Sequence, residues 1–404
     1  MKTGNVKRHL KYEWQANVNS SGEKEKMLYR KFGKTGMDVS ALGFGAMRLP
    51  IIGGKFDHID EKTAEAMLKY AVGHGVNYVD TAYVYHGGMS EKVVGKILAK
   101  NDLRDKVYIA TKLPTFMVQK RKDMDKFLNE QLERLKTDHI DFYLMHGLGK
   151  DRWDAMKDLG VMDFMDSALE DGRIRHAGFS YHDEPENFEA IVDDYDWSFV
   201  QIQFNFMDTK YQAGLKGLKY VAKKGMGLAV MEPIKGGQLT GELPAGVQQI
   251  WDKAETQRTA AEWALKYVWD YPEAHVVLSG MSTLDQVKEN VRLADDAKPN
   301  SLTKKEKSLY KEAEKAYRSL VAVDCSDCKY CMPCPQGVDI PGNFRMLNNA
   351  AMFGKADIMK MVYNTYIPEQ ERASNCKDCA ECEEKCPQHL PIREKLKEVH
   401  KTLG

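Results

Sequence analysis

The chain alternates eight short apolar runs with longer segments of helical periodicity, and this alternation restricts its fold more than any other feature. Each run is rich in Val, Ile, Leu, Phe and Tyr, as expected of strands buried on both faces of a parallel sheet. The runs are Val39–Met47, Asn77–Ala82, Val107–Leu113, Ile140–His146, Ile174–Ser180, Phe199–Asn205, Gly227–Pro233 and His275–Gly280. Eight strand–helix repeats favour an α/β fold, a (β/α)8 TIM barrel, over an open doubly wound sheet.

The segments between the runs carry helical spacing and recognisable ends. Before the last run, apolar side chains recur three or four residues apart, at Ala261, Ala264, Leu265, Val268 and Trp269. Helix ends are predicted at Gly73–Gly75 and at Asp171–Gly172. The segment Leu28–Val39 predicts a hairpin with its turn at Lys34–Gly36, which would close the bottom of the barrel.

The length predicts more than one domain. A chain of 404 residues exceeds what one hydrophobic core usually supports, and a TIM barrel needs about 250 residues. We expect an N-terminal extension over residues 1–27 and the barrel over 28–298. Residues 299–404 would then hold a helical linker, with a charged helix from Lys304 to about Ser319, and a small, mainly helical domain.

Charge and hydropathy exclude several classes of partner. Lys plus Arg number 59, as do Asp plus Glu, so the net charge gives no ground for nucleic-acid or membrane binding. No apolar run reaches the length of a membrane span, and the N-terminus has no apolar core of a secretory signal. We therefore expect a cytoplasmic protein that binds neither nucleic acid nor membrane.

Four titratable side chains fall where the strands end, which is where the reacting groups of a TIM barrel lie. Asp80 ends the second run, Tyr85 follows in its loop, Lys112 is near the end of the third run, and His146 ends the fourth. A Tyr hydroxyl with a pKa of about 10 is a poor acid at neutral pH. A neighbouring ammonium lowers that pKa, and a carboxylate keeps the ammonium charged. With a His to polarise a carbonyl oxygen, the set could protonate an alkoxide formed by hydride addition.

Each of these residues taken alone is more often a cap, a turn residue or a packing residue. Their joint order on consecutive strands makes the catalytic interpretation stronger. The segment DTAYVYHGGMSE (Asp80–Glu91) resembles the aldo-keto reductase signature Asp-Thr-Ala-x-x-Tyr-Gly-x-x-Glu. IATKLP (Ile109–Pro114) and DFYLMHGL (Asp141–Leu148) resemble the Lys and His segments of that family, and the similarity spans about residues 28–295.

The resemblance implies an NAD(P)H-dependent reductase that transfers a hydride to an aldehyde or ketone. It implies that Tyr85 is the general acid and that Lys112 lowers its pKa. Asp80 would pair with Lys112, and His146 would orient the carbonyl of a small-molecule substrate.

The resemblance also covers cofactor-binding stretches, in GRIRHAGFS (Gly172–Ser180), VQIQFN (Val200–Asn205) and EPIKGG (Glu232–Gly237). It implies that Ser180 and Gln201 hold the nicotinamide carboxamide. The loop from Glu232 to Leu239 would wrap the pyrophosphate, and Glu289 and Asn290 would lie near the adenine. The implied cofactor-binding residues are Gly45, Ala46, Met47, Asp80, Ser180, Gln201, Met231, Glu232, Pro233, Ile234, Gly236, Gly280, Gln286, Glu289 and Asn290.

Three positions depart from the pattern of the family. Tyr181 stands where many members have Asn, Met231 where a Tyr often stacks on the nicotinamide, and His86 where Gly usually follows the catalytic Tyr. Many NADPH-specific members place Lys and Arg around the adenosine 2′-phosphate, and the matching positions here are Gly280 and Gln286. We therefore expect weak discrimination between the two cofactors or a preference for NADH, unless another basic residue reaches the phosphate.

All eight cysteines lie after residue 324, in two runs. The first run, C-x2-C-x2-C-x2-C-P, contains Cys325, Cys328, Cys331 and Cys334. The second, C-x2-C-x2-C-x3-C-P, contains Cys376, Cys379, Cys382 and Cys386. The second run has the bacterial ferredoxin spacing, in which the fourth Cys ligates the other cluster.

We predict two [4Fe-4S] clusters that exchange one ligand. One would be held by Cys325, Cys328, Cys331 and Cys386, and the other by Cys334, Cys376, Cys379 and Cys382. Zinc on pairs of C-x2-C is the alternative, but four consecutive cysteines before a Pro favour iron–sulfur. The helix-friendly segment Asp339–Arg372 resembles the helical ferredoxin modules of respiratory and disulfide-reductase subunits.

The cofactors predicted for the barrel and for the C-terminal domain transfer different numbers of electrons. Nicotinamide moves a hydride and clusters move single electrons, so a flavin usually mediates, and the sequence has no flavin-specific motif. We therefore expect a carbonyl reductase with accessory clusters. The alternatives are an electron-transfer or redox-sensing protein, whose clusters serve a protein partner, and a regulatory module that senses cofactor state. The intact set of Asp80, Tyr85, Lys112 and His146 favours the reductase.

Overall fold

The computed structural model describes residues 27–325 and 328–404, so nearly all of the predicted extension 1–27 lies outside the described residues. Eight parallel strands close into a barrel in the order β10-β3-β4-β5-β6-β7-β8-β9. They are β3 (Leu42–Gly45), β4 (Tyr78–Asp80), β5 (Tyr108–Leu113), β6 (Ile140–Leu148), β7 (Ile174–Tyr181), β8 (Phe199–Gln203), β9 (Gly227–Met231) and β10 (Val276–Gly280). Each strand coincides with one of the apolar runs to within a few residues, which confirms the TIM barrel.

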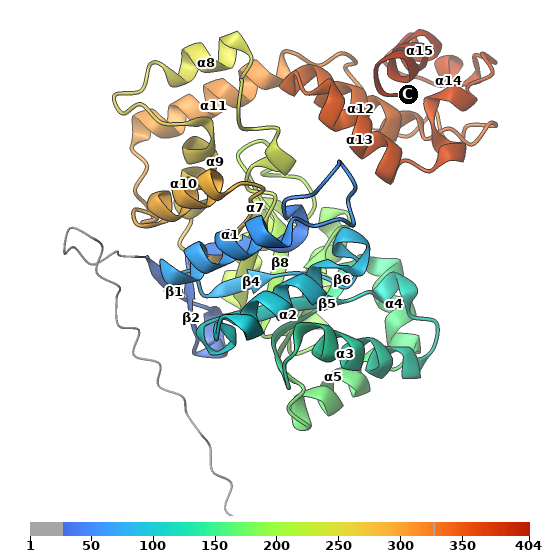
Figure 1. Cartoon of the computed structure of the whole chain (residues 1–404). Coiled ribbons are helices and arrows are strands. Elements are labelled where there is room, and N and C mark those ends of the chain that lie inside the picture. Colours follow the sequence, from blue (N-terminus) through green and yellow to red (C-terminus); the bar gives the residue numbers. More distant parts are fainter. Residues whose placement is uncertain (1–26, 326–327) are drawn as a thin grey trace, which may run out of the picture. The chain divides into compact units, whose positions relative to one another are not determined.

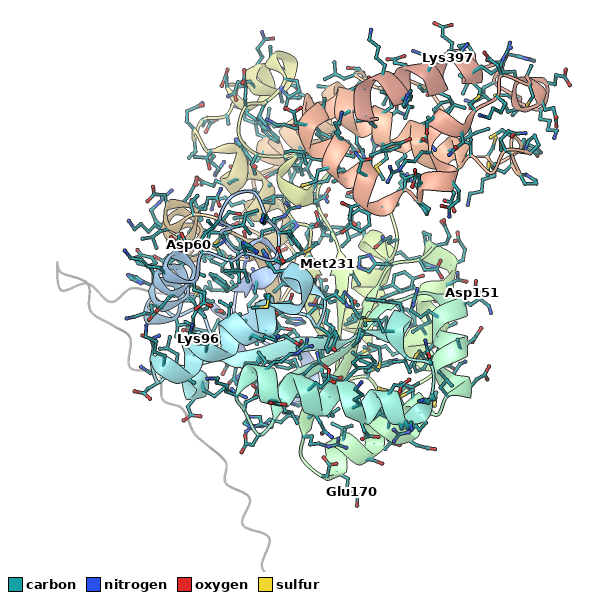
Figure 2. The ribbon with its side chains drawn as sticks, turned by 45° about the vertical axis from the view of Figure 1, so that its right-hand side comes forward. Asp60, Lys96, Asp151, Glu170, Met231 and Lys397 are labelled. Atoms are coloured by element: carbon teal, nitrogen blue, oxygen red, sulfur yellow. The ribbon has the colours of Figure 1, made fainter. Side chains whose placement is uncertain are left out.

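Helices follow the strands in chain order, and Figure 1 shows α1, α2 and α3 outside β4 and β5. The helices of this part of the chain are α1 (Glu61–Gly73), α2 (Ser90–Lys100), α3 (Arg121–Leu135), α4 (Lys150–Asp158), α5 (Val161–Glu170), α6 (Phe188–Asp193), α7 (Gly214–Lys223), α9 (Ala260–Trp269) and α10 (Leu284–Ala294). Figure 2 shows Met231 of β9 in the middle of the barrel, whereas Lys96 of α2 and Glu170 of α5 lie at its periphery. The strands lie inside because both of their faces are apolar, and the helices lie outside because each has one apolar stripe that packs on the strands.

A hairpin fills the bottom of the barrel, as predicted. Strands β1 (Tyr29–Lys31) and β2 (Asp38–Ser40) pair antiparallel around a turn that contains Gly36 with φ of +77°. The ring of Phe32 is fully buried, with its centroid 4.9 Å from that of Phe142. Because Phe142 lies near the start of its strand, the plug occupies the end opposite to the strand termini that carry the titratable residues.

The chain forms two compact units, and each of them is made of three separate segments of the chain. The first contains the barrel strands and comprises residues up to Phe204, Asp208–Pro233 and Val268–Asn300. The second comprises Asn205–Met207, Ile234–Tyr267 and Ser301–Gly404. The predicted boundary at residue 298 is thus close to the last break, but the segment Ile234–Tyr267 belongs with the C-terminal residues.

The second unit is mainly helical. Its helices include α8 (Ala245–Trp251), α11 (Lys304–Arg318), α12 (Ile340–Phe353), α13 (Ala356–Tyr366), α14 (Glu381–Glu384) and α15 (Ile392–Leu403). One of its apolar cores contains Trp251 stacked on Trp263 at 4.6 Å, together with Tyr310 and Phe353. A second core lies beside the cysteines and is built by α12, α13 and α15. Among the described residues, no helix is both long and apolar enough to cross a membrane.

Candidate functional site

The four predicted catalytic residues come together at the carboxyl ends of adjacent strands. Lys112 of β5 lies with its Nζ 2.8 Å from both carboxylate oxygens of Asp80, the last residue of β4. The same Nζ donates to the carbonyl oxygen of Thr81 at 2.7 Å and lies 4.9 Å from the ring centroid of Tyr85. The ring of His146 is 6.1 Å from that of Tyr85, at 83° between the planes.

The charge state of Lys112 follows from two opposing effects. Its side chain is only 1% exposed, and burial by itself lowers the pKa of an ammonium. The carboxylate of Asp80 and the neighbouring Tyr85 outweigh burial, so the pKa of Lys112 lies above its usual value. A permanent ammonium therefore stands beside the phenol of Tyr85.

His146 is held neutral. Burial lowers its pKa well below the usual value, and the positive charges of Lys112 and Arg152 lower it further. Its Nδ1 is buried and has no hydrogen-bond partner among the described residues. A neutral imidazole with one uncommitted nitrogen can donate to a carbonyl oxygen or accept from a bound hydroxyl.

A buried hydrogen-bond network connects the backbone of Lys112 to α3 and α2. Gln131 of α3 donates to the carbonyl oxygen of Lys112 at 3.0 Å and to Glu91 at 2.6 Å. Thr111 donates to the same carboxylate at 2.6 Å, and the hydroxyl of Tyr143 donates to Gln131 at 2.8 Å. The network holds the backbone of β5 in place at Thr111 and Lys112. Sequence reasoning included Glu91 in the motif but missed Gln131, since a single Gln on a helix gives no such signal.

His86, the residue after Tyr85, ties a distant loop to the catalytic segment. It lies in the 3-10 segment η3 (Tyr85–Gly88), is 1% exposed and has a left-handed backbone with φ of +53°. Its Nδ1 bonds the carbonyl oxygen of Phe56 at 2.6 Å, and its Nε2 accepts from the backbone N–H of Leu49 at 3.2 Å. The ring of Phe56 stacks on the imidazole at 4.5 Å. The loop Leu49–Asp60 is therefore fastened to the residue beside the phenol.

Two predicted nicotinamide contacts lie on neighbouring strands. Ser180 and Gln201 are paired across β7 and β8, and both are buried. Ser180 accepts from the backbone N–H of Gly147 at 2.8 Å, and Gln201 donates to the sulfur of Met231 at 3.5 Å. The Oε1 of Gln201 is buried without a hydrogen-bond partner among the described residues. A buried acceptor in need of a donor fits the amide N–H group of a nicotinamide.

The predicted adenosine end contains a cation that sequence alignment missed. Gln286 uses its amide oxygen to accept from the backbone N–H groups of Ser282 and Thr283 at the start of α10, so this side chain serves as a helix cap. Arg48 runs across Gly280, where an added Cβ would lie 3.3 Å from its Cδ and Cγ. A hydrogen bond at 2.8 Å from the hydroxyl of Ser282 to the carbonyl oxygen of Arg48 fixes this arrangement.

The remaining predicted cofactor residues lie at strand ends or on α10. Gly45, followed by Ala46 and Met47, pairs with Gly280 across β3 and β10. Asn290 donates to the hydroxyl of Ser279 at 3.0 Å, so it also braces β10. Glu289 lies beside it on α10, and Glu232 and Pro233 follow the end of β9.

Ile234 and Gly236 belong to the second unit and lie in the loop that continues from β9. The 3-10 segment η7 (Lys235–Gly237) begins this loop, with φ of +49° at Lys235, +61° at Gly236 and +92° at Gly237. Glycine adopts positive φ without strain, so Gly236 and Gly237 suit this backbone.

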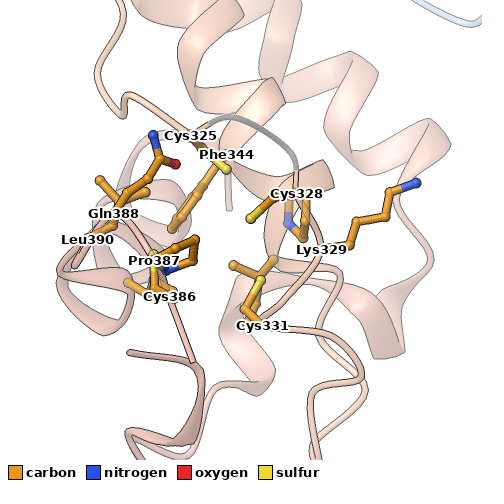
Figure 3. Close-up of a pocket in the computed structure, with 12 residues that line it drawn as sticks. Cys325, Cys328, Lys329, Cys331, Phe344, Cys386, Pro387, Gln388 and Leu390 are labelled. Atoms are coloured by element: carbon orange, nitrogen blue, oxygen red, sulfur yellow. The ribbon is translucent and has the colours of Figure 1, made fainter. Parts of the chain in front are cut away.

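Four cysteines line one pocket of the second unit. Figure 3 shows Cys325, Cys328 and Cys331 of the first run facing Cys386 of the second across the same space. Phe344 and Leu390 supply apolar walls. The structure thus brings together the four cysteines that the sequence assigned to one cluster.

Of the other four cysteines, Cys382 lies in the same core and Cys334 and Cys376 pack against it, whereas Cys379 is exposed. Burial, then the charge of Glu383, raises the pKa of Cys382 to about 11, and the nearby Cys376 and Cys379 add to the rise. Burial likewise raises the pKa of Cys331 to about 11. Ligation would therefore require iron to displace these thiol protons.

Comparison with known proteins agrees with both parts of the chain. The L-galactose dehydrogenase of Arabidopsis thaliana is 28% identical over 284 residues, which cover 66% of this chain and 88% of the relative. The holo structure of aldo-keto reductase AKR11C1 from Bacillus halodurans shares 27% identity with a TM-score of 0.59, and covers 71% of this chain and 96% of that chain. An aldo-keto reductase from Klebsiella pneumoniae in complex with NADPH shares the fold at 22% identity and a TM-score of 0.55, with 70% and 94% covered.

Two family models match successive parts of the chain. Residues 324–390 match the 4Fe-4S dicluster domain, which removes the zinc alternative for the cysteine runs. Residues 41–309 match the aldo/keto reductase family model. The chain therefore belongs to the aldo/keto reductase family and carries a 4Fe-4S dicluster domain at its C-terminal end.

Proposed function

We propose that the protein is an NAD(P)H-dependent oxidoreductase that transfers a hydride to the carbonyl of a small aldehyde or ketone. The observation that carries this proposal is the placement of the Lys112 ammonium between the carboxylate of Asp80 and the ring of Tyr85. A pure electron relay has no use for a phenol held beside a buried, charge-paired ammonium. The relationship to L-galactose dehydrogenase supports chemistry between an alcohol and a carbonyl group.

NAD(P)H supplies the hydride when bound, and the residues of the chain handle the carbonyl and the proton. His146, neutral and half-buried, would donate to the carbonyl oxygen and orient it. Tyr85 gives its phenolic proton to that oxygen as negative charge develops there. Lys112 stabilises the resulting phenolate by Coulomb attraction, and Asp80 keeps Lys112 charged and fixed.

The nicotinamide would be held by the buried side chains of Ser180 and Gln201, with Met231 packing against it in place of an aromatic ring. The loss of that aromatic ring removes stacking but keeps an apolar wall. NADPH in the Klebsiella relative supports a nicotinamide dinucleotide as the cofactor class. The remaining cofactor contacts are those named from the sequence.

We further propose two [4Fe-4S] clusters, one in the pocket of Cys325, Cys328, Cys331 and Cys386 and the other on Cys334, Cys376, Cys379 and Cys382. The clusters are accessory to hydride transfer, because a one-electron group cannot take part in it directly. Thiolates that ligate iron must stay reduced, which suits a cytoplasmic location.

The test is to purify the protein without oxygen and to follow NADPH and NADH oxidation with a panel of aldehydes, ketones and sugars. Carbonyl-dependent turnover that Tyr85→Phe removes would support the reductase. The electron-transfer alternative predicts instead that a one-electron acceptor consumes NAD(P)H and that Tyr85→Phe leaves this rate unchanged. That second pattern, with no carbonyl turnover, would overturn the proposal.

A further inference from the structure

Helix α12 takes part in two separate structures within the second unit. Near its beginning, Ile340, Pro341 and Phe344 line the cysteine pocket. At its end, Met352 and Phe353 belong to the other core, together with Leu239 of the loop that follows β9. One continuous helix of 14 residues therefore connects a cluster pocket to the loop expected to hold the pyrophosphate.

In its second half, α12 also fixes the chain that leads into the first cysteine. The side chain of Asn348 accepts from the backbone N–H of Val323 at 2.8 Å and donates to its carbonyl oxygen at 2.7 Å. Val323 precedes Cys325 by two residues, and its carbonyl oxygen also accepts from the N–H of Cys325 at 2.9 Å. A shift of Cys325 would therefore be transmitted through Val323 to Asn348 of α12.

At the other end, α12 holds the loop from Ile234 to Glu242, here called the cofactor loop. Leu239 is 2% exposed against the helix end, and the Nζ of Lys235 lies 5.9 Å from the ring centroid of Phe353. Lys355, just after the helix, donates to the carbonyl oxygen of Glu242 at 2.9 Å. Because the loop has only one short 3-10 segment of its own, these contacts set much of its conformation.

We propose that α12 couples the first cysteine pocket to the cofactor loop, so that a [4Fe-4S] cluster in that pocket tightens the binding of the nicotinamide dinucleotide. A cluster would tie Cys325, Cys328 and Cys331 to Cys386 and so immobilise the pocket against the beginning of α12. The helix would then present Phe353 and Lys355 in fixed positions, and the loop would lose less entropy on binding. The coupling rests on the proposed function.

This role needs no electron to pass between cluster and nicotinamide. The cluster acts through packing, so the absence of a flavin-specific motif presents no difficulty. Coupling between two sites is reciprocal, so a bound dinucleotide must also protect the cluster. That reciprocity gives a measurement independent of turnover.

The experiment compares five full-length proteins: the native holoprotein, Cys328→Ser, Phe353→Leu/Lys355→Met, the combination of these two variants, and a control, Lys360→Met. Lys360 is an exposed lysine within α13, and its removal deletes the same charge as Lys355→Met. The Kd for NADP⁺ is measured by calorimetry. Loss of the first cluster in Cys328→Ser should raise the Kd by about fivefold or more, the usual lower range of such couplings.

Phe353→Leu/Lys355→Met, here called the helix-end variant, tests the coupling without removing a cluster ligand. Phe353→Leu/Lys355→Met should keep its full iron content, yet bind NADP⁺ as weakly as Cys328→Ser, and adding Cys328→Ser to it should cause no further loss. In the native protein, saturating NADP⁺ should slow the removal of cluster iron by a chelator. In the helix-end variant it should not, and Lys360→Met should behave as the native protein.

An unchanged Kd in Cys328→Ser, with the remaining cluster intact, would overturn the coupling and leave the proposed function standing. Equal protection of the cluster by NADP⁺ in the helix-end variant would also overturn it. A native holoprotein that binds neither NADP⁺ nor NAD⁺ would instead remove the proposed function, and the coupling with it.

Discussion

The Nζ of Lys112 lies 2.8 Å from each carboxylate oxygen of Asp80, and both side chains are almost completely buried. A buried pair in this geometry is costly to break, because removing one partner leaves the other charge without compensation. We expect the pair to serve both the proposed chemistry and the stability of the barrel. It also allows the two roles to be tested separately.

Tyr85→Phe should abolish carbonyl reduction with little effect on cofactor binding. Removing a positioned general acid should lower kcat by about 10²–10⁴-fold, while the fold and the ammonium of Lys112 remain. Steady-state kinetics and a direct titration with the cofactor measure the two effects. Near-normal turnover in the variant would eliminate Tyr85 as the acid.

Lys112→Met should destabilise the barrel by about 3–5 kcal/mol at neutral pH, because Asp80 is left buried and unpaired. Burial then raises the pKa of Asp80. A carboxyl group with a raised pKa in the folded state favours folding at low pH, so the penalty should shrink as the pH falls. Chemical unfolding between pH 5 and about pH 8 measures how the stability penalty of Lys112→Met changes with pH. This range lies above the usual pKa of about 3.9, because the pKa of Asp80 is raised in the folded variant.

The double variant Asp80→Asn/Lys112→Met is the matched control for this prediction. With both charges gone, it should recover much of the lost stability and lose the pH dependence that Asp80 causes. It should remain inactive, since no ammonium stands beside Tyr85. A single variant as stable as the native protein would show that the pair contributes nothing to folding.

His86→Gly should weaken substrate binding more than it slows the chemical step. Glycine suits the left-handed backbone at this position, but it loses the bonds to Leu49 and Phe56 that fasten the loop Leu49–Asp60. We expect KM for the carbonyl substrate to rise several-fold, about 1 kcal/mol per lost hydrogen bond, with kcat changed less. A fall in kcat alone would contradict this role.

The same histidine gives a pH dependence. Burial lowers the pKa of His86, partly offset by hydrogen bonds to backbone carbonyl oxygens, so the folded state prefers the neutral ring. A base with a lowered pKa in the folded state makes stability fall as the pH drops below its unfolded value of about 6.5. Unfolding measured at pH 5.5 and pH 7.5 should therefore show a smaller difference for His86→Gly than for the native protein.

Cofactor preference should be weak and should depend on Arg48. Gly280 and Gln286 bring no charge to the place where the 2′-phosphate is expected, whereas Arg48 extends across Gly280. Arg48→Ala should lower kcat/KM about tenfold for NADPH and much less for NADH, about 1.4 kcal/mol of selective loss. Lys288→Ala on α10 is the control, since Lys288 already pairs with Asp285.

Comparison of kcat/KM for NADH and NADPH shows where Arg48 acts and how strongly the native protein discriminates. Equal losses with NADH and NADPH in Arg48→Ala would place the guanidinium on the pyrophosphate instead. A native preference for NADPH above about a hundredfold, or 2.7 kcal/mol, would contradict weak discrimination.

The protein reconstituted without oxygen should hold about eight irons and eight acid-labile sulfides per chain, four for each cluster. Cys386→Ser should perturb the cluster bound mainly by the first cysteine run, because Cys386 lines the pocket of Cys325, Cys328 and Cys331. Cys334→Ser should perturb the other cluster. Electron paramagnetic resonance of the reduced protein distinguishes them, and the reverse pattern would show that the ligands do not cross.

The strands and the gathering of the four titratable side chains could be predicted from the sequence, because both depend on local signals. A buried parallel strand needs a continuous apolar run, and a barrel strand presents its last residues at one rim, so Asp80, Lys112 and His146 were expected together. The eight cysteines carry their ligand spacing in the chain itself. Their assignment to two clusters stays a prediction.

Other features depend on contacts between distant segments and could not be predicted. The sequence shows a His after Tyr85 but not that Phe56 and Leu49 would occupy its two nitrogens. It shows Gly280 without a charge but not that Arg48 would cross it. Gln131 and its carboxylate partner meet only because α3 packs beside α2.

The second compact unit also bears on whether the C-terminal part can be detached. The segment Ile234–Tyr267 buries Val247, Trp251 and Trp263 against residues that come after Ser301, among them Tyr310 and Phe353. A chain cut after Pro299 would expose these tryptophans to water and leave the cofactor loop without its support. We therefore expect the segment Ile234–Tyr267 and the iron–sulfur part to fold and unfold as one body, because they share one compact unit.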